Sequence, residues 1–255
     1  MTANAIKTMA SNITTCNASE ESTNKKATGP ISPKKPHKQK KQPQQPRDYT
    51  TGEEIFNSIS HGVGILLSIA AIPLCVVTAV SHGAGFHLLA ALVYSICMLL
   101  EYTFSTVYHI VPPSKGKRVM RVFDHSFIFI YIAACYLPYC LITLASQGGY
   151  YLAIFVWVVA IAGLFMEVFW RNKPRWVSAL AYVLLGWSIL MFIPQLFELL
   201  APAGFWLLLA GGVCYTVGAL FYLRTKSIRY MHSVFHLWVL AGSVCQFLSI
   251  ILFVL

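Results

Sequence analysis

Residues 56–80 read FNSISHGVGILLSIAAIPLCVVTAV and contain no Asp, Glu, Lys or Arg. A helix needs about 20 predominantly apolar residues to cross the roughly 30 Å hydrocarbon core of a bilayer, so this run is long enough to span a membrane. The rest of the chain repeats the pattern, with further apolar runs at residues 87–111, 122–145, 150–170, 176–197, 203–223 and 231–255. We therefore expect an all-α integral membrane protein, built as a bundle of seven transmembrane helices.

The positions of the basic residues give the predicted bundle an orientation. All 19 Lys and Arg residues fall either within residues 1–50 or in every second connection between the apolar runs. The residues in those connections are Lys115, Lys117, Arg118, Arg121, Arg171, Lys173, Arg175, Arg224, Lys226 and Arg229. Because basic loops stay on the cytoplasmic side of a membrane, we expect a cytoplasmic N-terminus and a C-terminus outside.

Composition divides the chain into two parts. Residues 1–50 are rich in Lys, Pro, Gln, Ser and Thr and poor in large apolar side chains, which predicts a disordered basic cytoplasmic tail. Residues 51–255 form the predicted seven-helix transmembrane domain. Over the whole chain 57% of residues are hydrophobic and 11% are charged. Soluble domains carry about a quarter of charged residues, so the composition excludes an ordinary soluble protein.

The formal net charge of +10 indicates an anionic partner. The basic residues lie on one membrane face and in the tail, where anionic lipid headgroups attract them, so we expect membrane lipids and no nucleic acid. The expected location is the plasma membrane, or the inner membrane in a bacterium. The seven cysteines form no C-x-x-C pair, and the chain has no Gly-rich phosphate loop and no G-x-S-x-G elbow. We therefore expect the cysteines to be packing residues, and any chemistry to come from polar residues inside the bundle.

Three histidines are predicted to meet at one depth of the bundle. His109 ends the second apolar run, and His232 and His236 open the seventh. Because successive spans alternate in direction, both positions fall at the cytoplasmic end. Residues four apart share one helix face, so His232 and His236 can hold one ion together. A lone membrane histidine is most often an interhelical hydrogen-bond partner, whereas three ionisable rings at one depth favour a functional site.

Three imidazoles with an open fourth position form the ligand set of a catalytic zinc, which lowers the pKa of a bound water to about 7. We therefore expect Zn²⁺ at His109, His232 and His236. Asp124 opens the third run at the same level and is the candidate for activating that water, with Ser105 bonding the water or the substrate oxygen. An alternative role for Asp124 is a helix N-cap or first-turn carboxylate that complements the helix dipole.

The first apolar run adds polar residues at the same level. Glu54, Asn57 and His61 have the i, i+3, i+7 spacing of one helix face. A histidine that binds a metal also needs a partner for its second ring nitrogen. Asn57 and the pair Glu53 and Glu54 are the candidate partners, and the sequence does not choose between them.

A polar stripe follows one face of the second apolar run. Ser105 lies one turn from His109, and Glu101 lies one turn further. Such a stripe should face the protein interior rather than lipid. The role of Glu101 stays open: it marks a proton or substrate path, or it pairs in neutral form with Tyr102 or His125.

These motifs resemble those of the hemolysin III family, the bacterial branch of the progestin and adipoQ receptor family. The matching pieces, all within residues 50–255, are Glu53-Glu54-x-x-Asn57-x-x-x-His61-Gly62, Ser105-x-x-x-His109, Phe123-Asp124-His125-Ser126, Gly211-Gly212-x-x-Tyr215-x-x-Gly218 and His232-x-x-x-His236. The resemblance implies a seven-helix bundle with zinc held by His109, His232 and His236. Glu101 is outside the recognised pattern.

The resemblance also implies an activity. By likeness to the receptor branch and to alkaline ceramidases, Asp124 and Ser105 would stand beside the metal-bound water, and the reaction would be hydrolysis of a lipid amide, such as a ceramide, or another acyl linkage. The process would be membrane-lipid homeostasis. Two alternatives stay open. One is a non-catalytic receptor or sensor with structural zinc, and the other is a pore-forming cytolysin, the label that the bacterial branch carries.

Overall fold

The structure is a computed structural model that describes residues 49–255. The predicted tail therefore lies outside the described residues, apart from its last two. Residues 49–255 contain helices and connections and no strand. Among them, seven helical spans are long and apolar enough to cross a membrane by length and composition. The predicted fold class is thus confirmed, while the orientation in the membrane stays a prediction.

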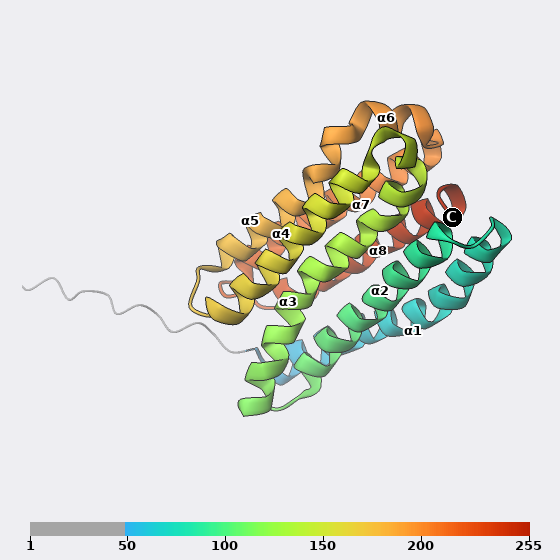
Figure 1. The fold of residues 1–255 in the computed structure, drawn as a ribbon. Coiled ribbons are helices and arrows are strands. Elements are labelled where there is room, and N and C mark those ends of the chain that lie inside the picture. The colour runs from blue at the N-terminus through green and yellow to red at the C-terminus, as the bar shows by residue number, and fades with distance from the viewer. Residues whose placement is uncertain (1–48) are drawn as a thin grey trace, which may run out of the picture. The chain divides into compact units, whose positions relative to one another are not determined.

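Successive spans lie side by side in the bundle (Figure 1). Contacts join α1 to α2, α2 to α3, α3 to α4, α4 to α5, α5 to α7, and α7 to α8, and α8 returns to α1. The bounds are α1 (Thr51–Ser81), α2 (Phe86–Ile110), α3 (Lys115–Pro138) with the π-helical η1 (Tyr139–Thr143), the 3₁₀ turn η2 (Ala145–Gln147), α4 (Gly149–Phe169), α5 (Arg175–Gly186) with η3 (Trp187–Phe192) and α6 (Ile193–Leu199), α7 (Pro202–Arg224) and α8 (Met231–Phe253).

Two helices begin before their apolar runs do, because polar caps start them. At α1 the Thr50 hydroxyl accepts the Glu53 N–H at 3.3 Å, and the Glu53 carboxylate accepts the Thr50 N–H at 2.8 Å. At α3 the Ser114 hydroxyl accepts the Lys117 N–H at 3.1 Å. Residues 115–121, expected in a connection, are therefore the first turns of α3, and the predicted start at residue 122 is wrong.

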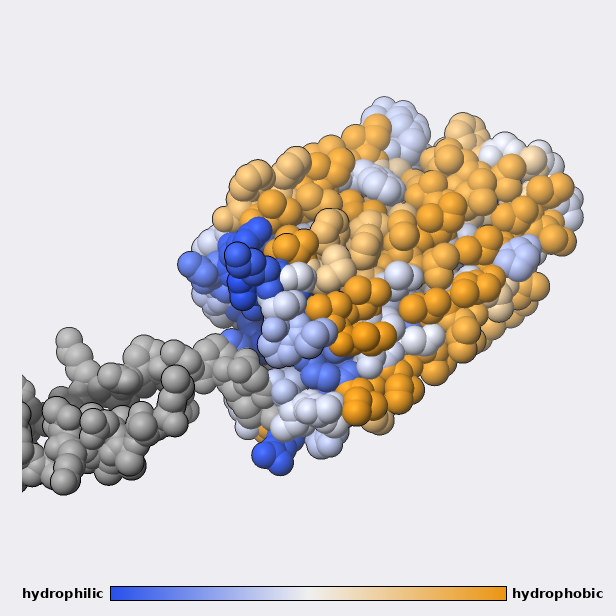
Figure 2. Space-filling view, turned by 90° about the horizontal axis from the view of Figure 1, so that it is seen from below, coloured by the Kyte–Doolittle hydropathy of each residue, from blue (hydrophilic) through white to orange (hydrophobic). Residues whose placement is uncertain are grey.

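The bundle is apolar outside and polar at selected points inside. Large side chains such as Leu66 and Phe169 are exposed on its flank, whereas Glu101, Asp124 and Glu167 are buried. Figure 2 shows hydrophobic side chains over the flank and hydrophilic side chains gathered at one end. We call the end that carries the α2–α3, α4–α5 and α7–α8 connections the basic face. This distribution suits a bundle surrounded by hydrocarbon, with its charges at an interface.

Glycines let α7 and α8 approach closely. A Cβ atom on Gly211 would lie 3.0 Å from the Gln246 side chain and 3.2 Å from the Gly242 carbonyl oxygen. A Cβ atom on Gly242 would lie 2.8 Å from the Tyr215 ring. Small residues permit such contacts between membrane helices, where packing rather than the hydrophobic effect holds the helices together. The packing fixes α8, and α8 carries two of the three predicted metal ligands.

Candidate metal centre

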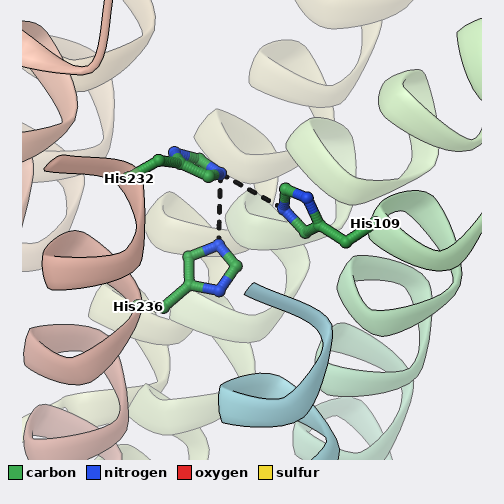
Figure 3. A group of neighbouring side chains, drawn as sticks. All are labelled: His109, His232 and His236. Carbon is green, nitrogen blue, oxygen red and sulfur yellow. Dashed lines mark hydrogen bonds between the residues drawn. The ribbon is translucent and has the colours of Figure 1, made fainter. Parts of the chain in front are cut away.

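The three predicted ligands meet at the basic face. His109 lies in the last turn of α2, and His232 and His236 lie in the first two turns of α8. Their exposed fractions are 2%, 4% and 1%. The Nε2 atom of His232 lies 3.2 Å from that of His109 and 3.1 Å from that of His236, as Figure 3 shows. These histidines form one buried group whose ligand atoms all lie within 4.8 Å of one another.

The spacing of the three nitrogens fits a metal ion. Two imidazole nitrogens on a tetrahedral zinc, each at 2.0–2.1 Å, stand about 3.3 Å apart. The two measured separations, 3.2 and 3.1 Å, are close to that value. Borderline-soft divalent ions favour neutral imidazole nitrogen as a ligand.

The positions of the protons on the three imidazole rings also favour a cation between them. The Nδ1 atom of His109 lies 2.5 Å from the Glu54 carboxylate, and that of His236 lies 3.2 Å from the Asn57 carbonyl oxygen. Both oxygens only accept, so in the neutral rings each Nδ1 carries the proton and each Nε2 presents a lone pair. One proton on the Nε2 of His232 can satisfy only one of these lone pairs. A cation between the three nitrogens satisfies all of them.

Helix α1 supplies the outer contacts of the ligands. The Asn57 amide lies 3.5 Å from the Nδ1 atom of His109. The Ser60 hydroxyl lies 3.2 Å from the Nδ1 atom of His236. Ser233 donates to the Asn57 side-chain oxygen at 2.6 Å. The face predicted from residue spacing on α1 thus contacts both ligand-bearing helices, as the residues that orient the ligands of a metal site do.

Two further α1 residues of the prediction take different places. The His61 ring stacks on the His236 ring, with centroids 3.6 Å apart. Glu53 accepts the backbone N–H of Tyr230 at 2.8 Å. Tyr230 has a φ of 59°, a left-handed conformation that is uncommon for a side chain of this size. This hydrogen bond therefore joins the start of α1 to the residue that precedes α8.

Tyr49 and His232 form a contact that the sequence does not reveal. Their rings stack with centroids 4.9 Å apart, while the Nδ1 atom of His232 has no hydrogen-bond partner among residues 49–255. Burial raises the pKa of the Tyr49 phenol above its ordinary value, although the nearby Arg175 guanidinium acts in the opposite direction. Tyr49 therefore covers the site as a neutral ring.

Asp124 and Ser105 lie together beside the histidines. Both are buried, with exposed fractions of 6% and 1%, and the Ser105 side chain lies close to the Asp124 carboxylate. The Nδ1 atom of His125 lies 3.1 Å from the Oδ2 atom of Asp124. Because α3 begins at Lys115 with Ser114 as its cap, Asp124 is not at a helix start. The alternative role as a cap or first-turn carboxylate is therefore wrong.

Glu101 is buried on the predicted polar stripe. Its exposed fraction is 5%, so the stripe faces the interior as expected. Its Oε2 atom has no hydrogen-bond partner within the described part of the chain. The side chain lines the cavity described next, and the structure leaves both proposed roles of Glu101 open.

A cavity of about 140 Å³ opens beside the histidines between α3, α5, α7 and α8. Its polar end is lined by Ser105, Asp124, His232 and His236, among others. Its far end is lined by the apolar side chains of Ile132, Cys135, Val183, Trp187 and Val239. From Asp124 to Tyr136, which both line it, α3 rises about 18 Å. The cavity is therefore long, with its histidines and carboxylates at one end.

Some contacts of the site were not among the predictions from the sequence. Ser60 and Ser233 are missing from the predicted set although both bond the site. Ser60 follows Asn57 by three residues and Ser233 follows His232 directly, so helical spacing contained a signal for each. Tyr49 had no such signal, because it precedes the first helix.

The chain is similar to proteins of one known family. Residues 49–247 match the family model described as Haemolysin-III related. The chain is 39% identical to Hemolysin-3 of Bacillus cereus over 203 residues, which cover 80% of this chain and 92% of that protein. It is 34% identical to the Hemolysin-3 homolog of Bacillus subtilis (strain 168) over 205 residues, covering 80% and 96%. The monocyte to macrophage differentiation factor of Homo sapiens is 24% identical over 169 residues, covering 64% and 69%.

Proposed function

Since the chain belongs to the haemolysin-III-related family, we propose that it is a zinc-dependent hydrolase of an acyl linkage, such as a ceramide-like amide, in a membrane lipid. The observation that carries the proposal is the meeting of three imidazole nitrogens with a buried carboxylate at the end of a long cavity. Separate parts of this arrangement occur in structural sites, whereas a ligand set, a base and a substrate cavity together are typical of a catalytic one.

His109, His232 and His236 would hold the zinc. When bound, zinc would supply a Lewis acid that lowers the pKa of a water molecule to about 7 and polarises a carbonyl. The Asp124 carboxylate accepts the proton of the attacking water and delivers it to the leaving amine or alcohol. Ser105 and His125, which contact Asp124, orient its carboxylate for both transfers.

The cavity supports a lipid substrate. The apolar side chains at its far end suit a hydrocarbon chain, and a linkage at the head of that chain would then lie beside Asp124 and His232. The exposed apolar flank keeps the bundle in the bilayer, so a lipid reaches the cavity without leaving the membrane. The product is a fatty acid together with the remaining lipid, which fits a role in membrane-lipid homeostasis.

The location of the site follows from the charges. We place the basic face in the cytoplasm, with the C-terminus outside and the bundle in the plasma membrane, because loops rich in Lys and Arg stay inside. The basic tail then meets anionic lipid headgroups of the inner leaflet. Labelling of cysteines introduced one at a time into the α1–α2 and α2–α3 connections of intact cells tests this orientation. Labelling of the α2–α3 connection from outside would reverse it.

The proposal is tested with purified chain in detergent micelles. We expect one zinc per chain by elemental analysis and release of fatty acid from a fluorescent N-acyl lipid. Asp124→Asn should keep the zinc and lose at least about 100-fold in turnover, the usual contribution of a general base. Turnover that is unchanged in Asp124→Asn would contradict the proposal.

The same variants separate the alternatives. A sensor with structural zinc would bind the metal and show no turnover in any preparation. A cytolysin would release dye from lipid vesicles equally well as wild type and as Asp124→Asn, and also after loss of all three histidines. The relatives called Hemolysin-3 make the dye-release measurement a necessary part of the test.

A further inference from the structure

A second cavity, of about 220 Å³, opens at the basic face. We call it the basic cleft. Its walls come from the first turns of α3 and from the α4–α5 connection with the start of α5. Five cationic side chains line it together with one carboxylate: Arg118, Arg121, Arg171, Lys173, Arg175 and Glu167.

The single carboxylate of the basic cleft is already engaged. Glu167 accepts hydrogen bonds from the Lys173 ammonium at 2.6 Å and from the Ser178 hydroxyl at 2.6 Å. The Tyr182 hydroxyl lies 3.3 Å from the same carboxylate. The negative charge of Glu167 is therefore paired with Lys173 and does not neutralise the arginines of the cleft.

The arginines of the cleft have hydrogen-bond donors that are not paired with a carboxylate. Within residues 49–255, no carboxylate forms an ion pair with Arg118, Arg121, Arg171 or Arg175. Arg175 donates to the Thr225 hydroxyl and lies over the Tyr222 ring, 5.6 Å from its centroid. Its Nε atom is buried and has no hydrogen-bond partner among the described residues. A buried donor without a partner, in a concave site with excess positive charge, indicates a missing anion.

The chemistry of the cleft favours phosphate. Guanidinium groups present paired donors that match phosphate oxygens, which makes arginine the residue of choice for this anion. The volume of about 220 Å³ is several times the roughly 30 Å³ that one water occupies in the liquid. The cleft thus has room for a phosphate and the atoms that join it to a larger molecule.

The basic cleft adjoins the reaction cavity. His125 and Tyr222 line both. On α3, Arg121 and Arg118 precede Asp124 by three and six residues, which places them about 4.5 and 9 Å from it along the helix axis. A phosphate in the cleft would therefore stand only a few bonds from a linkage held at Asp124.

From these contacts we propose that the basic cleft binds the phosphate headgroup of the acyl lipid that the protein cleaves. The inference rests on the proposed function for the cleavage, and it narrows the substrate from membrane acyl lipids in general to those that carry a phosphate. The positive-inside rule alone requires basic residues on this face. It does not require them to surround a cleft that shares two side chains with the reaction cavity.

Binding is measured by calorimetry on the full chain in neutral detergent, so that the result does not depend on turnover. The probes are a short-chain phosphatidic acid, the diacylglycerol with the same chains, and inorganic phosphate. We expect phosphatidic acid to bind more tightly than either of the other two. In Arg118→Gln/Arg121→Gln its Kd should rise at least about tenfold, the effect of one lost charge-assisted contact.

The control is Arg224→Gln/Arg229→Gln, which removes the same charge from the same face at residues that do not line the cleft. Its Kd for phosphatidic acid should stay within about twofold of wild type, since distant exposed charges are screened. If both double variants bind phosphatidic acid equally weakly, binding comes from the overall charge of the face and not from the cleft. Inorganic phosphate that binds as tightly as phosphatidic acid would assign the cleft to a soluble anion instead.

Turnover separates this proposal from the proposed function. In an active preparation, Arg118→Gln/Arg121→Gln should raise KM for a phosphate-bearing acyl lipid at least about tenfold and leave that of its neutral counterpart unchanged. A neutral lipid that is cleaved as well as its phosphate-bearing counterpart by the wild type would overturn the substrate assignment. Tight phosphatidic acid binding without hydrolysis of any acyl lipid would overturn the proposed function and support the phosphate site.

Discussion

Replacement of Glu54 by Gln tests whether α1 holds the metal ligands in place. The Glu54 carboxylate lies 2.5 Å from the Nδ1 atom of His109, and the His109 side chain is fully buried. Loss of such a second-shell partner lowers metal affinity by 10–100-fold, which corresponds to about 1.4–2.7 kcal/mol. Glutamine keeps a neutral acceptor, and the Glu54 side chain is 20% exposed. We therefore expect the zinc Kd to rise about tenfold, at the lower end of this range.

The assay is a zinc titration in detergent against a chromogenic chelator of known affinity. Two control variants accompany it. Lys117→Gln removes the cation that lies 2.8 Å from the other Glu54 oxygen and leaves the contact with His109 intact. Glu198→Gln removes an exposed carboxylate on α6. Both should bind zinc within about twofold of wild type, because neither change removes the contact between Glu54 and His109.

Two results would refute this reasoning. If Glu54→Gln binds zinc as wild type does, the short contact does not orient His109. If Lys117→Gln weakens zinc as much as Glu54→Gln, the effect comes from the charge of the region and not from the hydrogen bond to the ring.

Three further outcomes follow from the structure. Ser105→Ala should lower turnover about tenfold or more at unchanged zinc content, whereas Ser95→Ala on the same helix, whose hydroxyl bonds the Ala91 carbonyl oxygen, should leave turnover unchanged. Gly242→Ala should lower stability by about 1–3 kcal/mol, because its Cβ would meet the Tyr215 ring at 2.8 Å, while Gly62→Ala, with no atom within 4 Å, should not; thermal unfolding measures both. Removal of zinc with a chelator should lower the unfolding temperature of the wild type and leave a His109→Ala, His232→Ala, His236→Ala triple variant unchanged.

Much of the fold could be predicted because the bilayer imposes a length. Each apolar run became one helical span, and the polar stripe of Glu101 and Ser105 faces inward, since lipid does not accept such groups. The starts of α1 and α3 were less predictable. Hydropathy marks where a helix meets hydrocarbon, whereas the caps at Thr50 and Ser114 decide where the helix begins.

The candidate site was predictable in its members and less so in its contacts. His232 and His236 share a helix face by spacing alone, and basic loops placed His109 at the same depth. The hydroxyl of Ser60 and the ring of Tyr49 reach the site through packing between helices and through the path of the chain before α1. Such contacts depend on rotation of each helix about its axis, which a hydropathy pattern does not fix.

The two ligand-bearing helices stand far apart in the chain, with His109 and His232 separated by 123 positions. During biosynthesis the three histidines can therefore come together only after α8 has been made, because every earlier intermediate contains His109 alone of the three. A product cut short before Met231 would contain six of the seven spans and only one of the three histidines. Formation of the three-histidine group would thus report that the whole polypeptide has been assembled.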